Sequence, residues 1–286
     1  MKVAIVTGAN RGLGLALVRG LCRALGEGAA VYLTARDEGR GREAARALEA
    51  EGLGPRFARL DVADEGSVAA LAGRLAAEHG RVDVVVSNAA MPITPARPQR
   101  EQVEGFVETN NVGTHRLMRH LGPLLADGAR YLVVASSFGR LRHLRPPARD
   151  RFDVATMTLD DVEALLREYV RDVLDGSAEA KGWGDWINVP SKVAQVASAK
   201  IFARELGAEA IRRGILVNAV CPGLVDTEAS RPWFADMSKA KSPDDAAADL
   251  VWLATLPPDA REPHGELVQY RRVLPFDERG VAPAGA

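Results

Sequence analysis

The chain has 286 residues, of which 37 are basic, 38 are acidic and two are cysteines. The balanced charge excludes an electrostatic case for nucleic acid or an anionic membrane as the main partner, so we expect a small molecule instead. No signal peptide, membrane span or metal site is evident, and two cysteines in so long a chain indicate buried thiols in a reducing compartment, with the cytoplasm as the expected location.

The first predicted unit is a strand, a glycine turn and a helix. Residues 2–6 form a short apolar run typical of a buried strand, and an apolar helical stretch ends near Leu25. Between them, Gly8 lets the turn close, while Gly12 and Gly14 allow the backbone to approach a pyrophosphate at the helix N-terminus. The unit predicts a dinucleotide site, although an ordinary strand-to-helix turn is the alternative.

Further strands alternate with helices along the chain. Strand-like apolar runs occupy residues 30–34, 57–62, 82–87, 131–135, 216–220 and 267–270, with helical stretches between nearly all of them. Strands joined by helices of this length require crossover connections, so we expect a mostly parallel sheet with helices on both faces, a doubly wound α/β domain of the Rossmann type. The domain is expected to span residues 1–273, followed by a mobile tail at 274–286.

A series of motifs lies along this framework. In chain order they are Thr7-Gly8-Ala9-Asn10-Arg11-Gly12-Leu13-Gly14, Asp61-Val62, Ser87-Asn88-Ala89-Ala90, Asn110, Ser136-Ser137, Lys192 and Cys221-Pro222-Gly223. Their order and spacing resemble those of short-chain dehydrogenases/reductases. Within that family the chain looks most like the monomeric, NADPH-dependent carbonyl reductases, because of residues 33–37, a long insertion after the serine, and residues 256–260 and 263–265.

The resemblance implies which residues contact the cofactor. These are Gly8, Asn10, Arg11, Gly12, Leu13, Gly14, Arg36, Asp61, Val62, Asn88, Ala89, Lys192, Pro222, Gly223 and Thr227. It places Asp61 and Val62 at the adenine and Asn88 and Ala89 along the ribose. Pro222, Gly223 and Thr227 are expected against the nicotinamide, although the Pro-Gly pair can also be only a turn that leaves a strand.

The end of the second strand indicates which cofactor is used. An acidic residue there holds the ribose 2′-hydroxyl of NAD. The 2′-phosphate of NADP instead requires that this acid be absent and that a cation lie nearby. By resemblance, Ala35 stands at the position of the acid, and Arg36 with Arg11 could clamp the phosphate. NADP(H) is therefore the expected cofactor. In the alternative interpretation both arginines are solvated surface charges and Asp37 neutralises Arg36.

The catalytic residues of the resemblance are complete except for one. Ser137 matches the hydroxyl that binds the substrate oxygen, with Ser136 serving backbone groups, and Lys192 matches the cation. Asn110 is expected to hold a water that relays protons to Lys192. Asn188 stands where the family has its proton-donating tyrosine, four residues before Lys192. Asparagine can donate a hydrogen bond but releases no proton, which costs on the order of 10²- to 10⁴-fold in rate.

Three substitutes for the missing acid are open. A water held by Asn110 and Lys192 is the first choice. Asp185 and His143 lie close enough in sequence to reach the pocket, but Asp185 is more typical of a loop or helix start. His143 lies in a basic stretch typical of the surface.

The insertion at about 140–182 contains an amphipathic helix. Thr158 begins a capping-box-like Thr-Leu-Asp-Asp, and apolar residues follow at helical spacing. By resemblance this helix covers the face that most relatives use to pair subunits, which implies a monomer. Alternatively, the helix only extends the core.

A loop at 224–241 is expected to cover the substrate. It carries Trp233 and Phe234 in a segment with too many charges and turn residues for a core strand. The two rings indicate an apolar or aromatic ligand, or they anchor the loop.

Three functions remain open from these residues. The first is an NADPH-dependent carbonyl reductase of a small ketone or quinone-like substrate with an atypical active site. The second is a redox-neutral enzyme, such as a cyclase, dehydratase or isomerase, on the same scaffold. The third is a catalytically disabled NADP-binding protein.

Overall fold

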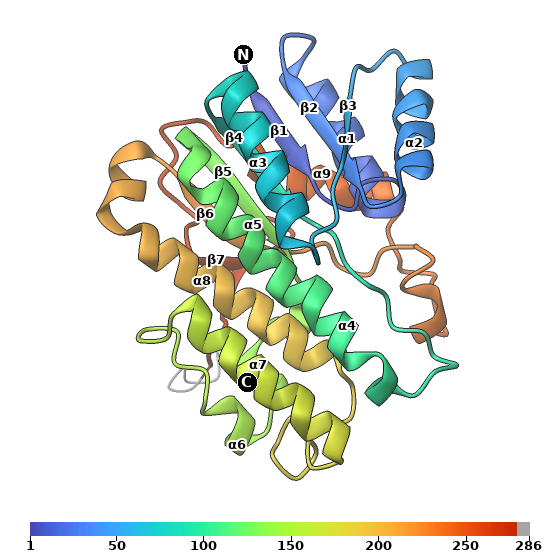
Figure 1. Ribbon diagram of the computed structural model, residues 1–286, viewed down its shortest axis with the longest axis vertical. Coiled ribbons are helices and arrows are strands. Elements are labelled where there is room, and N and C mark those ends of the chain that lie inside the picture. The colour runs from blue at the N-terminus through green and yellow to red at the C-terminus, as the bar shows by residue number, and fades with distance from the viewer. Residues whose placement is uncertain (279–286) are drawn as a thin grey trace.

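The computed structural model describes residues 1–278, which form one eight-stranded sheet in the order β3-β2-β1-β4-β5-β6-β7-β8 (Figure 1). All neighbouring strands are parallel except β7 and β8. The strands are β1 (Val3–Val6), β2 (Ala30–Ala35), β3 (Arg56–Arg59), β4 (Val82–Ser87), β5 (Leu125–Val134), β6 (Leu216–Cys221), β7 (Glu266–Gln269) and β8 (Arg272–Leu274). The predicted doubly wound, mostly parallel α/β fold is confirmed.

Helices cover both faces of the sheet. They are α1 (Gly12–Leu25), α2 (Glu38–Ala50), α3 (Glu65–His79), α4 (Val103–Val107), α5 (Gly113–Leu121), α6 (Pro146–Arg149), α7 (Leu159–Asp175), α8 (Asn188–Arg213) and α9 (Pro243–Ala254). One apolar core joins α1, α2 and α9 to the sheet, and a larger one joins α3, α4, α5, α7 and α8 to the opposite face. Among the described residues no helix is long and apolar enough to cross a membrane.

The strand order fixes the place of the site. The order reverses between β1 and β4, and the carboxyl ends of parallel strands meet at the same edge of the sheet. The glycine loop follows β1, the Ser136-Ser137 pair comes shortly after β5, and Cys221 ends β6. Groups that are far apart in the sequence are therefore gathered at one crevice.

The antiparallel strand β8 was not predicted from the sequence. Tyr270 and Arg271 both have positive φ, 50° and 62°, and form the tight turn between β7 and β8. Because β8 is short and largely exposed, it shows no apolar run that could mark it as a strand.

The expected start of the tail at residue 274 is too early. Leu274 ends β8, and Phe276 is buried, with its carbonyl accepting a hydrogen bond from the Leu141 N–H at 2.9 Å. Glu278 pairs with Arg140. Residues 274–278 therefore pack against the start of the insertion, and the remainder of the expected tail, 279–286, lies outside the described residues.

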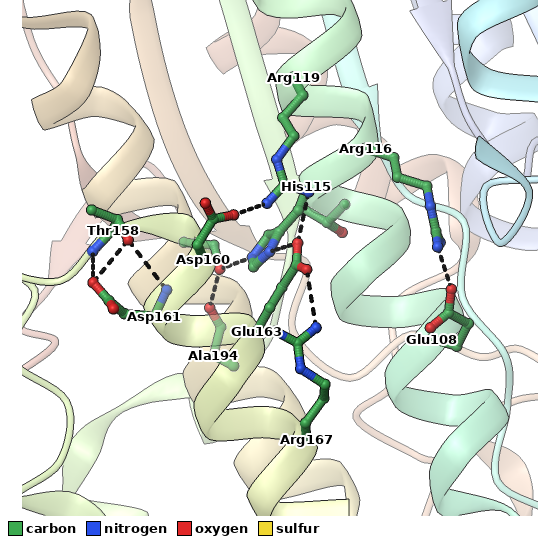
Figure 2. Close-up of polar contacts among 12 residues, drawn as sticks. Glu108, His115, Arg116, Arg119, Thr158, Asp160, Asp161, Glu163, Arg167 and Ala194 are labelled. Atoms are coloured by element: carbon green, nitrogen blue, oxygen red, sulfur yellow. Dashed lines mark hydrogen bonds and ion pairs between the residues drawn. The ribbon is translucent and has the colours of Figure 1, made fainter. Parts of the chain in front are cut away.

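The insertion forms α6 and α7, and α7 lies alongside α8 (Figure 1). Its predicted capping box is present: the Thr158 hydroxyl accepts from the Asp161 N–H at 3.2 Å, and the Asp161 carboxylate accepts from the Thr158 N–H at 2.8 Å. Two residues after Asp161 in α7, Glu163 Oε1 lies 3.0 Å from Nδ1 of the buried His115 in α5 (Figure 2). The insertion is thus joined to the core by a buried polar contact as well as by apolar packing.

Candidate active site

The loop after β1 is so closely packed at two of its glycines that a side chain there would clash with the protein's own backbone. Gly8 has φ +62°, and a Cβ there would lie 2.7 Å from the Ala89 Cα, while a Cβ on Gly14 would lie 2.5 Å from the Gly8 carbonyl oxygen. The first turn of α1 contains no acidic residue, and the side chain of Arg11, its N-cap, makes no capping hydrogen bond. The N–H groups of this helix start are therefore available to an anion.

Asn88 and Thr7 hold this loop against the end of β4. The Thr7 hydroxyl accepts from the N–H groups of Asn88 and Ala89, both at 2.9 Å. The Asn88 amide donates to the Thr7 and Gly8 carbonyls at 2.8 and 3.1 Å. Asn88 thus braces the glycine loop in addition to lining the crevice.

A cavity of about 800 Å³ runs over this loop, and it brings together most of the expected cofactor-binding residues. It is lined by Gly8, Asn10, Arg11, Gly12, Leu13, Gly14, Arg36, Asp61, Val62, Asn88, Ala89, Lys192 and Thr227, among others. Pro222 and Gly223 instead line an adjoining cavity of about 430 Å³. The dimensions and the open helix N-terminus fit a dinucleotide.

Arginine side chains surround the far end of the larger cavity. Asp37 caps α2: its carboxylate accepts from the Arg40 N–H at 2.9 Å and lies 3.8 Å from Arg40 Nε. The Asp37 carboxylate therefore contacts the helix start and Arg40, and no ion pair joins it to Arg36. Arg36 is exposed and lines the cavity, as does Arg40, which the sequence analysis missed. Its signal was its position in the first turn of the helix that follows Arg36. Arg11 pairs with Glu228, a contact between two exposed side chains and therefore weak.

The smaller cavity contains the expected catalytic residues. Asn110, Ser137, Asn188 and Lys192 all line it, together with Cys221. Ser137 begins a short 3-10 turn (Ser137–Gly139), and its N–H donates to the Cys221 sulfur at 3.1 Å. Ser136 accepts from the Phe138 N–H at 3.2 Å and so caps this turn, the backbone role expected for it.

Lys192 lies at the boundary between the two cavities and lines both. Its ammonium donates to the Gln195 side-chain oxygen at 2.7 Å and to the Val134 carbonyl at 3.3 Å. Burial lowers the pKa of Lys192 to about 8, and the nearby Cys221 thiol opposes that shift only partly. A lysine in this state can both hold a hydroxyl group and exchange a proton near neutral pH.

The comparison with known proteins agrees with this geometry. The sequence model of the short chain dehydrogenase family matches residues 2–144. Carbonyl reductase [NADPH] 1 of Rattus norvegicus is 38% identical over 279 residues, covering 96% of this chain and 98% of that protein. The human protein of the same name is 38% identical over 277 residues, covering 96% and 98%. The chain belongs to the short-chain dehydrogenase/reductase family.

Solved structures support the same assignment. Menthone neomenthol reductase from Mentha piperita has a TM-score of 0.76 and 27% identity, covering 94% of this chain and 98% of that chain. Salutaridine reductase from Papaver somniferum has a TM-score of 0.79, covering 93% and 99%, and at 24% identity shows the fold alone. The expected family and its likeness to carbonyl reductases are confirmed, and the protein is an oxidoreductase of the short-chain dehydrogenase/reductase type.

Two features of this family member concern its proton supply. Asn188 is the first residue of α8, partly buried, and no hydrogen-bond partner for its side chain occurs within residues 1–278. Asn110 lies in a π-helical turn (Glu108–Val112), and its side-chain oxygen accepts from the Met91 N–H at 2.7 Å. Its backbone oxygen accepts from the Gln195 amide nitrogen at 2.9 Å. The Gln195 side chain therefore lies between Asn110 and Lys192, where a relay water was expected.

The two alternative acids do not line the cavity. Asp185 is exposed, and its backbone carbonyl accepts from Gln99 at 2.8 Å. His143 packs edge-on against Phe138 at 5.4 Å, and burial lowers its pKa. Within the described residues, Lys192 and Cys221 are the titratable side chains that line the cavity.

Aromatic rings form one wall of the cavity. Trp233 and Phe234, expected from the sequence, line it together with Phe138 and Trp186, which the sequence analysis missed. The Trp186 ring lies 5.7 Å from that of Trp233 and 5.3 Å from that of Phe138. The signal for the missed rings was their position in the chain, next to Ser137 and two residues before Asn188. These ring contacts join the loop to the rest of the wall, and the rings present an apolar surface to the cavity.

Proposed function

We propose that the protein is an NADPH-dependent carbonyl reductase acting on a small ketone or quinone-like substrate, with an active site that works without the tyrosine. The observation that carries this proposal is the position of Lys192. Its buried ammonium borders both the larger cavity and the smaller one that contains Ser137 and Asn188. A cofactor and a carbonyl compound could therefore meet beside one proton-exchanging group.

NADPH fits the residues of the larger cavity. The N-terminus of α1, which no side chain caps, suits the pyrophosphate. Arg36 and Arg40 supply cations for a 2′-phosphate, while the Asp37 carboxylate is engaged in capping α2. The names of the carbonyl reductase relatives include NADPH, in agreement with this choice.

The chemistry is divided among three side chains. Bound in the larger cavity, NADPH would supply a hydride for the carbonyl carbon. Ser137 donates a hydrogen bond to the carbonyl oxygen, and the unpartnered amide of Asn188 provides a second donor. Lys192 supplies the proton, directly or through a water that it holds, because the amide cannot release one. Asn188 thus positions the substrate without acting as its acid.

The cavity also defines a substrate class. A volume of about 430 Å³ and a wall of Phe138, Trp186, Trp233 and Phe234 suit a compact apolar or aromatic carbonyl compound. Among the described residues no carboxylate lines this cavity, so an anionic or neutral substrate is favoured beside Lys192.

A monomer is part of the proposal. Helix α7 packs along α8 and is joined to α5 through Glu163 and His115. The outer side of α8 is therefore occupied by the chain's own insertion. Sedimentation equilibrium tests this part, and a dimer at micromolar concentration would contradict it.

The decisive experiment is NADPH oxidation with ketones, aldehydes and quinones, run with the native protein, with Ser137→Ala and with Asn188→Tyr, after NADPH binding has been measured for each. Turnover by the native protein that Ser137→Ala lowers by about 10²-fold supports the proposal. Binding of NADPH without turnover of any carbonyl substrate by the native protein would overturn it.

A redox-neutral enzyme is the second candidate, and one observation favours it. Asn188 cannot release a proton, and neither Asp185 nor His143 lines the cavity. Cyclisation, dehydration or isomerisation of a bound metabolite needs no tyrosine. The same experiment separates the candidates, because turnover confined to Asn188→Tyr indicates that the native site is not a reductase.

A further inference from the structure

Gln195 forms a polar bridge that the position of Lys192 alone does not reveal. Asn188, Lys192 and Gln195 follow one another at helical spacing along the same side of α8. Gln195 is only 2% exposed. Its amide nitrogen donates to the Asn110 backbone oxygen at 2.9 Å, and its oxygen accepts from the Lys192 ammonium at 2.7 Å. Because an ammonium only donates and a carbonyl only accepts, this orientation of the amide is the one that satisfies both partners.

Few hydrogen-bonding groups around the Gln195 bridge remain free. The Asn110 oxygen also accepts from the Thr114 hydroxyl at 2.9 Å, so both of its lone pairs are engaged. Of the three N–H groups of Lys192, one donates to Gln195 and one to the Val134 carbonyl. The third remains for the cavities that Lys192 lines. A carboxamide binds both neighbours but does not pass a proton between them.

We propose that Gln195 is a positioning residue that directs the Lys192 ammonium toward the two cavities and closes its proton exchange on the Asn110 side. Every proton that Lys192 gives or takes then passes through the cavities. The inference rests on the proposed function for its catalytic meaning, but the contacts that carry it do not depend on turnover. Two amides thus replace the expected proton donors: Asn188 stands at the position of the acid, and Gln195 lies at the position of the relay water.

The titration of Lys192 tests the contact directly. Protein labelled with ¹³C and ¹⁵N in lysine is titrated by NMR with NADP⁺ bound, and Lys192→Arg identifies the Lys192 signal. Gln195→Leu removes the acceptor and keeps a side chain of similar size, so it should lower the pKa of Lys192 by about one unit. The Cys221 thiol is the titratable group facing Lys192, and Cys221→Ser separates its contribution.

Hydrogen exchange of the ammonium tests the closure. Gln195→Ala leaves a polar gap between the Asn110 oxygen and Lys192 that a water can enter, whereas Gln195→Leu fills it. We expect Gln195→Ala to lower the pKa of Lys192 less than Gln195→Leu does. At matched fractions of protonated Lys192, we expect the ammonium to exchange faster in Gln195→Ala than in Gln195→Leu or in the native protein. Ser198→Ala, which removes a buried hydroxyl one turn further along α8, is the control for a general disturbance of the helix.

Two results would overturn the inference. An unchanged Lys192 titration in Gln195→Leu would mean that Gln195 does not hold the ammonium. Equal exchange in the native protein and in Gln195→Ala would mean that Gln195 closes no path. Failure of the carbonyl reductase proposal is a separate result, since it appears as missing turnover in the native protein while these NMR measurements remain unaffected.

Discussion

Asn188 lies one helical turn before Lys192 in α8, and both side chains line the same cavity of about 430 Å³. The cation that would depress the pKa of a tyrosine is thus in place, beside a residue with no proton to give. Replacement of this one residue is the most direct probe of how the site works.

Asn188→Tyr should raise the rate of ketone reduction. A positioned general acid contributes on the order of 10²- to 10⁴-fold, and the buried ammonium of Lys192 favours the ionised form of a tyrosine. Steady-state kcat with a ketone measures the gain. Asn188→Phe is the control, because it supplies the ring without the hydroxyl. Equal rates in the Tyr and Phe variants would show that the acid is supplied elsewhere.

Arg36→Ala should weaken NADPH binding by about 10- to 100-fold and leave NADH binding unchanged, because one charge-assisted contact to the 2′-phosphate is lost. Calorimetric titration with both cofactors measures this difference. Arg42→Ala is the matched control, since Arg42 is an exposed arginine on the helix that follows Arg36, but it pairs with Glu38 and does not line the cavity. Equal losses for NADPH and NADH would contradict the assignment of Arg36.

The rate of carbonyl reduction should fall as pH rises through about 8. Burial lowers the pKa of Lys192 to about 8, so the ammonium that donates the proton is present below this pH and is lost above it. The pH profile of kcat/KM reports groups of the free enzyme and gives the comparison. If this limb persists in Lys192→Met, another group is responsible.

The docking of α7 should make stability depend on pH. Burial lowers the pKa of His115 from 6.5, so the unfolded chain takes up this proton first and stability falls as pH drops below about 6.5. Burial alone would raise the pKa of Glu163, but hydrogen bonds and charge from His115 and Arg119 lower it to about 2, so its contribution is lost as pH falls from 4.5 toward 2. Urea unfolding as a function of pH measures both effects.

Glu163→Gln provides the variant for this dependence. It should lower the free energy of unfolding at pH 7 by about 2 kcal/mol, because a nearly buried carboxylate that accepts from charged groups is removed. Asp160→Asn is the control: Asp160 also pairs with Arg119 (Figure 2), but it is 85% exposed, and we expect a change below about 1 kcal/mol. Equal losses in the two variants would refute a buried role for Glu163.

The local features of this protein could be predicted from the sequence. The glycine loop, the capping box at Thr158, the absence of an acid at Ala35 and the amide at Asn188 are each properties of a few neighbouring residues. The alternation of strands with helices was enough to predict a mostly parallel sheet, because helical connections between neighbouring strands are crossovers and leave few other topologies. These patterns also gave the family, although they placed the end of the domain too early.

Only the tertiary structure decided which residues of the site contact one another. Gln195 meets Asn110 across 85 positions of the chain, and Arg40 enters the cavity only because α2 starts beside it. The exclusion of Asp185 and His143 likewise depends on where their loops fold. A sequence pattern reports which face of a helix or strand is apolar, whereas a hydrogen bond between distant residues depends on the packing of whole elements. The sequence alone determined the residue types of the site's motifs, and the fold decided which other side chains join them and which of them touch.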